Sequence, residues 1–286
     1  MKRFFAALLT LSLLLAACGN ATPAVTEAPE ATKVPETTAA PEEPRTRTVP
    51  ETITTEVFVG DMAIESSIVH SYDERGLLKE IVSYSNGTEV SRTTAETDEH
   101  GEVIRQSAVS GENAIVTESD LTYDDAGNLI RRVDTVSEND TVMDVREYTY
   151  NPDHTLAKAV FNSHRDAGYT TSNAYEYDAE GCEILEIRED SSGAVTHIET
   201  QYDENGRVTG TVTKTPDGDV LMYGETIYQE DGTVKQQTRF PDGTLSPSYT
   251  VTTYNAQGNP LTTETYNGEM LAMRMSYTYI TVPAFK

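Results

Sequence analysis

Several residue types that characterise common protein classes are scarce in this chain. Among its 286 residues there are two cysteines and no tryptophan, and 21 basic residues stand against 47 acidic ones. Two cysteines exclude a disulfide-rich scaffold. The net charge of −26 argues against nucleic acid as a partner, because such binding requires a basic surface. The acidity also disfavours adsorption to anionic lipid. It is typical of an extracellular protein kept soluble by its charge, with a surface for cations or calcium as the alternative.

Long apolar runs are also missing, with one exception at the N-terminus. Lys2 and Arg3 precede an apolar stretch, residues 4–15, that is too short to cross a membrane. The next residues, Leu15-Ala16-Ala17-Cys18, resemble the lipobox of bacterial lipoproteins. The resemblance implies that residues 1–17 are a signal peptide and that Cys18 carries lipid such as palmitate. The alternative is an ordinary signal peptide or a free thiol. We expect a protein anchored by lipid to a bacterial cell membrane and facing its extracellular or periplasmic side.

Proline is concentrated in the segment that follows. Six of the twelve prolines fall within residues 19–50, among Ala, Thr and Glu. Such a composition cannot bury enough apolar surface to offset the entropy of ordering, so we predict a disordered spacer. The expected organisation is a signal peptide at 1–17, a lipidated cysteine and linker at 18–50, and a folded domain at 51–286.

A motif of tyrosine, aspartate, two turn residues and glycine recurs about every 26 residues through that domain. A fixed period of this length indicates a repeat architecture. The full copies begin at Tyr72, Tyr123, Tyr177 and Tyr202, weaker copies begin at Thr97, Tyr150, Tyr228 and Tyr254, and Tyr279 lies where a ninth would begin. In Asp-x-x-Gly, the aspartate side chain can accept bonds from nearby amides and the glycine supplies a positive φ. We therefore assign a turn-forming role to Asp73, Gly76, Asp124, Gly127, Asp178, Gly181, Asp203 and Gly206, with calcium binding by the aspartates as the alternative.

Hairpin signals lie halfway between these turns. They include Asn86-Gly87, Asp217-Gly218, Asp242-Gly243 and Asn267-Gly268. The segments between turns are rich in Thr, Val, Tyr and Ile and tend to alternate with a period of two, which indicates strands. The sequence predicts an all-β domain, a long antiparallel meander of about 16–18 strands that curls into a spiral shell, a solenoid or a barrel-like sheet.

The motif Tyr-Asp-x-x-Gly-x-Leu, as in Tyr123 to Leu129, resembles the tyrosine-aspartate (YD, or Rhs-type) repeats of bacterial surface and secreted proteins. The resemblance covers most of residues 60–279 and implies β-sheets that spiral into shells, in proteins some of which are described as sugar-binding or wall-associated. The period here is longer than in the toxin members, and the chain ends soon after the last repeat. We expect a stand-alone surface lipoprotein and not a toxin carrier.

No catalytic or metal-binding motif stands out in the repeats. The sequence contains no HExxH pair, Gly-x-Ser-x-Gly elbow or phosphate-binding loop, so we expect neither enzymatic activity nor a cofactor. We predict that the domain binds or scaffolds an extracellular ligand, with carbohydrate or wall glycan the first candidate. The motif tyrosines Tyr123, Tyr150, Tyr177 and Tyr202 are candidates for stacking on that ligand, although packing between hairpins is the stronger interpretation. The alternatives are a structural or protein-interaction module of the envelope and a carboxylate-dependent glycoside hydrolase.

Cys182 directly follows Gly181, so we expect it beside a turn. We expect it to be incidental, with an intermolecular disulfide or a reactive thiol as the alternatives.

Overall fold

The domain is a closed antiparallel β-barrel. We analysed a computed structural model, which describes residues 45–60, 62–164 and 169–284. The predicted signal peptide, Cys18 and most of the predicted linker lie outside these residues. Within them every regular element is a strand: Thr46–Val59 (β1), Met62–Tyr72 (β2), Leu78–Ser85 (β3), Thr88–Thr97 (β4), Val103–Ser110 (β5), Asn113–Tyr123 (β6), Leu129–Val136 (β7), Thr141–Tyr150 (β8), Leu156–Ser163 (β9), Tyr169–Tyr177 (β10), Glu183–Asp190 (β11), Val195–Tyr202 (β12), Val208–Lys214 (β13), Val220–Tyr228 (β14), Val234–Arg239 (β15), Leu245–Tyr254 (β16), Pro260–Asn267 (β17) and Met270–Pro283 (β18).

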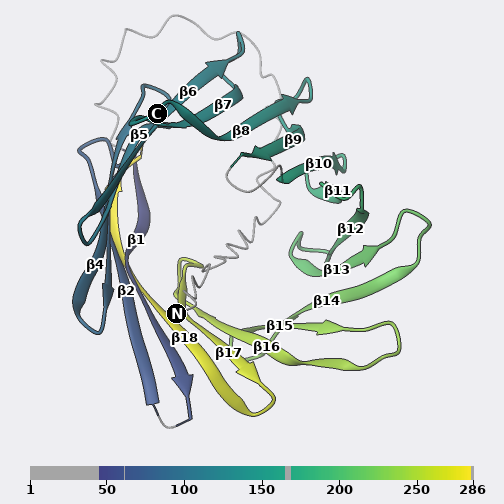
Figure 1. Cartoon of the computed structure of the whole chain (residues 1–286). Coiled ribbons are helices and arrows are strands. Elements are labelled where there is room, and N and C mark those ends of the chain that lie inside the picture. Colours follow the sequence, from purple (N-terminus) through teal and green to yellow (C-terminus); the bar gives the residue numbers. More distant parts are fainter. Residues whose placement is uncertain (1–44, 61, 165–168, 285–286) are drawn as a thin grey trace, which may run out of the picture.

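Each strand pairs with its neighbours in sequence, and β1 pairs with both β2 and β18. This last pairing closes the sheet into a barrel (Figure 1). The all-β meander is thus confirmed, with 18 strands, and closure selects the barrel among the predicted arrangements. A sheet of this length cannot remain flat, and closure removes both of its edges. No helix in the described part of the chain has the length and apolarity needed to cross a bilayer.

Strand β1 begins at Thr46, five residues before the predicted domain boundary. The predicted linker therefore extends too far, because Thr46–Pro50 pair with Tyr279–Pro283 and Val49 is buried. Pro50 is compatible with a strand here because the register shifts between Pro50 and Thr52.

The barrel has two chemically different faces. Residues that pair across strands share a face, and the motif tyrosines lie on the same face as Ile81 of β3 and Arg132 of β7. Ile81 and Arg132 line one cavity although three strands separate β3 from β7. Side chains that far apart converge only on the concave side of a curved sheet, so the tyrosine face lines the interior.

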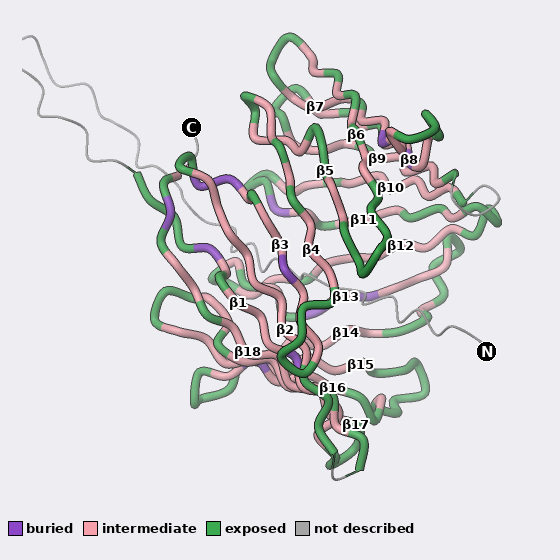
Figure 2. Tube along the Cα trace, turned by 60° about the vertical axis from the view of Figure 1, so that its left-hand side comes forward, coloured by how far each residue is buried: buried purple, intermediate pink, exposed green. Residues whose placement is uncertain are grey.

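The opposite face carries ion pairs between neighbouring strands at the surface, such as Arg105–Glu118 and Arg131–Glu147. Burial is sparse on both faces, and buried positions are scattered between exposed turns (Figure 2). Among the described residues no large side chain is fully buried. A barrel of this many strands is too wide for side chains to fill, which explains the thin core.

Candidate functional site

The motif aspartates and glycines build one rim of the barrel, here called the motif rim. Asp124 shows the arrangement: its Oδ1 accepts the amides of Ala126 (2.9 Å) and Asn128 (2.8 Å). Gly127 adopts a φ of +84° and donates its amide to the Asp124 carbonyl. The side-chain bond from Asn128 and these amide bonds lower the pKa of Asp124. The same pattern of bonds occurs at Asp73, Asp178 and Asp203, followed by Gly76, Gly181 and Gly206.

Hydrogen bonding between strands is incomplete near the motif rim. Here a seam denotes the junction of an odd-numbered strand with the next even-numbered strand, from β1–β2 to β17–β18. At the β7–β8 seam the last pair is Arg131 with Glu147, although β7 begins at Leu129 and β8 ends at Tyr150. Tyr150 spans this gap by donating its hydroxyl to the Leu129 carbonyl (3.0 Å). The tyrosine therefore replaces the missing strand pairing, and we call this bond a tyrosine latch.

Six of the nine seams carry the same latch. In each, the motif tyrosine donates to a carbonyl of the preceding strand: Tyr72 to Pro50 (2.6 Å), Tyr150 to Leu129 (3.0 Å), Tyr177 to Leu156 (3.0 Å), Tyr202 to Glu183 (2.7 Å), Tyr228 to Val208 (3.2 Å) and Tyr279 to Pro260 (2.7 Å). Burial raises the pKa of all six phenols, that of Tyr279 to about 12. Their hydroxyls are engaged within the protein.

Tyr123 is bonded differently from the other candidate tyrosines. Its hydroxyl donates to the carboxylate of Asp98 (2.6 Å), and its ring stacks on His100 at 4.2 Å. Burial and the bond to Asp98 raise the pKa of Tyr123. The four tyrosines considered for ligand stacking, Tyr123, Tyr150, Tyr177 and Tyr202, thus lie at neighbouring positions along the motif rim. Each is half-buried, with its hydroxyl occupied. This geometry favours their packing role.

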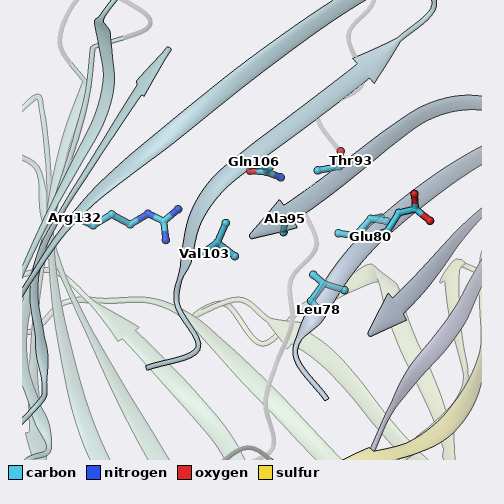
Figure 3. Close-up of a pocket in the computed structure, with 8 residues that line it drawn as sticks. Leu78, Glu80, Thr93, Ala95, Val103, Gln106 and Arg132 are labelled. Atoms are coloured by element: carbon cyan, nitrogen blue, oxygen red, sulfur yellow. The ribbon is translucent and has the colours of Figure 1, made fainter. Parts of the chain in front are cut away.

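One seam lacks its tyrosine. At β3–β4 the motif position is Thr97, and Ala95 stands two residues earlier, where three other repeats carry Tyr148, Tyr175 or Tyr277. A cavity of about 130 Å³ occupies this place (Figure 3). Its lining residues are Leu78, Glu80, Ile81, Thr93, Ala95, Val103, Gln106 and Arg132. The weak copy of the motif is therefore the signal in the sequence that marks this cavity.

A second and larger hollow, of about 620 Å³, lies at the β7–β8 seam, where the two strands separate. Tyr148 and Tyr150 line it, together with carboxylates, amides and a histidine from the adjoining turns: Asp124, Asn128, Glu147, Asn151 and His154. His154 occupies the motif's glycine position with a φ of +69°, and its Nδ1 lies 3.1 Å from the Asn128 side-chain nitrogen. This is the hollow among those described that includes a candidate stacking residue, Tyr150.

Charged side chains also gather inside the barrel on β7 and β8. Asp134, which is 5% exposed, accepts bonds from Arg132 (2.7 Å), Arg146 (2.6 Å) and Ser119 (2.7 Å). Burial alone would raise the pKa of Asp134, but the Ser119 bond and the two arginines lower it. Asp134 is therefore an ionised structural carboxylate and a poor proton donor.

The pKa of Glu183 is shifted in the opposite direction to that of Asp134. Burial raises the pKa of its carboxyl, and the neighbouring charge of Glu186 raises it further. A hydrolase requires such a group beside a second carboxylate in a substrate cleft. Glu183 lines neither of the two hollows described above. Over the described residues, no group of three or more His, Cys, Asp or Glu side chains is arranged to hold a metal ion.

Cys182 is buried, with 5% exposure, although it does follow a turn. Its amide donates to Asp178 Oδ1, and its thiol is not free. Cys182 is therefore not an exposed reactive thiol.

Comparison with known proteins gave only distant structural neighbours. No family model and no curated protein matches the sequence. A Tc holotoxin pore of Photorhabdus luminescens aligns with a TM-score of 0.28 and 12% identity, covering 74% of this chain and 15% of the toxin chain. A porin-like protein from Bacteroides uniformis aligns with a TM-score of 0.33 and 11% identity, covering 81% of this chain and 96% of that protein. A porin-like protein from Bacteroides vulgatus aligns with a TM-score of 0.32 and 13% identity, covering 82% of this chain and 99% of that protein. TM-scores this low support no inference about family or function.

Proposed function

We propose that this protein is a non-enzymatic, lipid-anchored surface protein whose barrel binds a carbohydrate at the β7–β8 seam. The observation that carries the proposal is the hollow between the strands there. It combines two tyrosines with side-chain amides and carboxylates. Aromatic faces pack against the apolar faces of sugar rings, while amides and carboxylates bond to hydroxyls. The net charge of −26 favours a neutral or cationic glycan over an anionic one.

His154 offers a direct test because it departs from the repeat. Substitution His154→Gly removes a side chain from the hollow but supplies the residue that best tolerates the positive φ there. We expect this variant to fold as stably as the wild type and to bind glycan about tenfold more weakly. A glycan array identifies the ligand, and titration calorimetry measures the affinity.

Glu147 and Glu118 provide a matched pair for the same assay. Both are exposed glutamates on the outer face, paired with Arg131 and Arg105 respectively, but only Glu147 lines the hollow. Glu147→Gln should weaken binding, whereas Glu118→Gln should leave it unchanged. Equal affinities for both variants, or an array without any binding, would refute the carbohydrate site.

The anchor is proposed from the sequence alone, because Cys18 lies outside the described residues. Metabolic labelling with palmitate should mark the wild type and not Cys18→Ala, and the variant should move from the membrane fraction to the soluble fraction. A labelled Cys18→Ala protein would contradict the anchor.

A protein-interaction role is favoured by a different observation. The hairpin between β1 and β2 exposes Val57, Val59, Met62 and Ile64 by 39–67%, and Met270 begins the neighbouring strand β18 with 70% exposure. Exposed apolar side chains gathered at one place mark contact surfaces. Crosslinking on intact cells through a photoreactive residue at position 62 would support this role if it captured one defined protein. Loss of that product in Ile64→Ser would establish the contact.

A further inference from the structure

The cavity at the β3–β4 seam lies at the seam whose motif position holds threonine in place of tyrosine. At six other seams a phenol ring fills the equivalent region and donates its hydroxyl to the carbonyl two residues beyond the last strand pair. The β3–β4 ladder ends with Glu80 and Thr94, so the equivalent carbonyl is that of Leu78. Leu78 lines the cavity. The broken seam thus retains the acceptor side of a tyrosine latch and lacks the phenol.

The cavity walls suit a ring with one polar edge. Leu78, Ile81, Ala95 and Val103 provide apolar contacts, while Thr93, Gln106 and Arg132 provide polar ones. In Figure 3 Arg132 extends from its own strand toward Val103 and Gln106. A volume of about 130 Å³ exceeds the roughly 30 Å³ that one water molecule occupies in the liquid, so a larger guest has room.

Arg75 lies at the motif-rim end of the same seam. Its guanidinium donates to Thr97 Oγ1 (2.7 Å) and to the Asp98 carbonyl (3.2 Å). At two seams that carry a motif tyrosine, a side chain from the preceding turn covers the tyrosine ring. Arg207 lies 4.4 Å from the Tyr228 ring centre, and His100 stacks on Tyr123. Arg75 belongs to the preceding turn in the same way, and a guanidinium over an aromatic face is a favourable contact.

We propose that the β3–β4 cavity is a binding site for a neutral phenol, either a free small molecule or the side chain of a partner's tyrosine. The phenol hydroxyl donates to the Leu78 carbonyl, its ring packs against Ile81, Ala95 and Val103, and Arg75 covers the ring. The guest thereby completes the one seam whose motif position holds threonine. This site lies on a different seam from the proposed carbohydrate site and does not depend on it.

Titration calorimetry with p-cresol, carried out on the full-length chain, tests the site. We expect saturable binding of p-cresol and at least about tenfold weaker binding of toluene, which has the same shape without the hydroxyl. Thr97→Tyr, which supplies the missing ring, should abolish p-cresol binding. Ala95→Phe fills the cavity by a second route and should do the same, so the test stands even if one variant fails to fold.

A positive control comes from a latched seam. Tyr150→Ala removes a ring from β7–β8, and p-cresol should raise the melting temperature of this variant. If p-cresol raises the melting temperature of Tyr150→Ala but does not bind to the wild type, the proposal is wrong. Equal binding of p-cresol and toluene to the wild type would also overturn it. Unchanged p-cresol binding by Thr97→Tyr and Ala95→Phe would also overturn it.

The source of the phenol is distinguished by a neutral Gly-Tyr-Gly peptide with blocked ends. Binding of the peptide with displacement by p-cresol assigns the site to a tyrosine of a partner. Binding of p-cresol alone assigns it to a free phenol.

Discussion

If the motif tyrosine acts as a latch, removing only its hydroxyl oxygen should destabilise the barrel. Tyr177→Phe is the cleanest case, because the hydroxyl donates to the Leu156 carbonyl (3.0 Å) and the ring stays in place. A hydrogen bond of this kind contributes about 1 kcal/mol net, and the carbonyl left without its partner sits at a half-buried seam. We expect the free energy of unfolding to fall by about 1 kcal/mol, or roughly 2–4 °C in melting temperature for a domain of this size.

The control is a tyrosine whose hydroxyl makes no hydrogen bond to a described residue. Tyr249 on the outer face stacks on Tyr266 with ring centres 5.0 Å apart and lies under Lys235. In urea denaturation followed by circular dichroism, the free energy of unfolding of Tyr249→Phe should lie within about 0.5 kcal/mol of the wild-type value. If Tyr177→Phe is equally neutral, the hydroxyl bond has no structural role and the latch is refuted.

Asp134→Asn should lower the free energy of unfolding by about 3 kcal/mol at neutral pH, because it leaves two half-buried arginines without their shared, buried carboxylate. Since the folded-state pKa of Asp134 is lowered, the loss should begin to shrink below about pH 4, where the unfolded chain takes up a proton, and should disappear once the folded carboxylate is protonated too. Denaturation at pH 7 and pH 3 measures this. Gly76→Ala should destabilise more than Gly127→Ala, because both glycines have positive φ but only at Gly76 would a Cβ collide with the Pro283 carbonyl; the comparison fails if both melt alike. Because burial raises the pKa of the six latch tyrosines, their contribution to stability should be constant below about pH 10 and fall above it, as an alkaline titration of ellipticity would show.

The sequence predicted the turns and strands because they are local. Asp124 and Gly127 determine their turn through bonds to residues within four positions of the aspartate, so the motif alone contains the information. Closure of the sheet could not be predicted in the same way. It depends on Thr46 meeting Pro283, and no local pattern distinguishes that pairing from an open spiral.

The role of the tyrosines was predicted only in part. Packing between hairpins was expected, but the hydroxyl bond of Tyr150 depends on where the ladder between β7 and β8 stops. Asp134 faces inward because it pairs with Ser119 in the register of β6 with β7, and the charge of Asp134 alone predicts a surface position. The sequence marks the β3–β4 seam by the weak motif copy at Thr97, but the cavity beside Ala95 can be interpreted only by comparison with the latched seams.

The free energy of unfolding of Thr97→Tyr shows directly whether the motif tyrosines close the seams. If the motif tyrosines hold the six latched seams and the β3–β4 seam lacks such a ring, the new tyrosine should fill the cavity and bond to the Leu78 carbonyl. The account predicts a gain of about 1 kcal/mol in urea denaturation, within the range of cavity-filling substitutions. A loss of stability, or no change, would show that the tyrosines do not close the seams and would contradict the account.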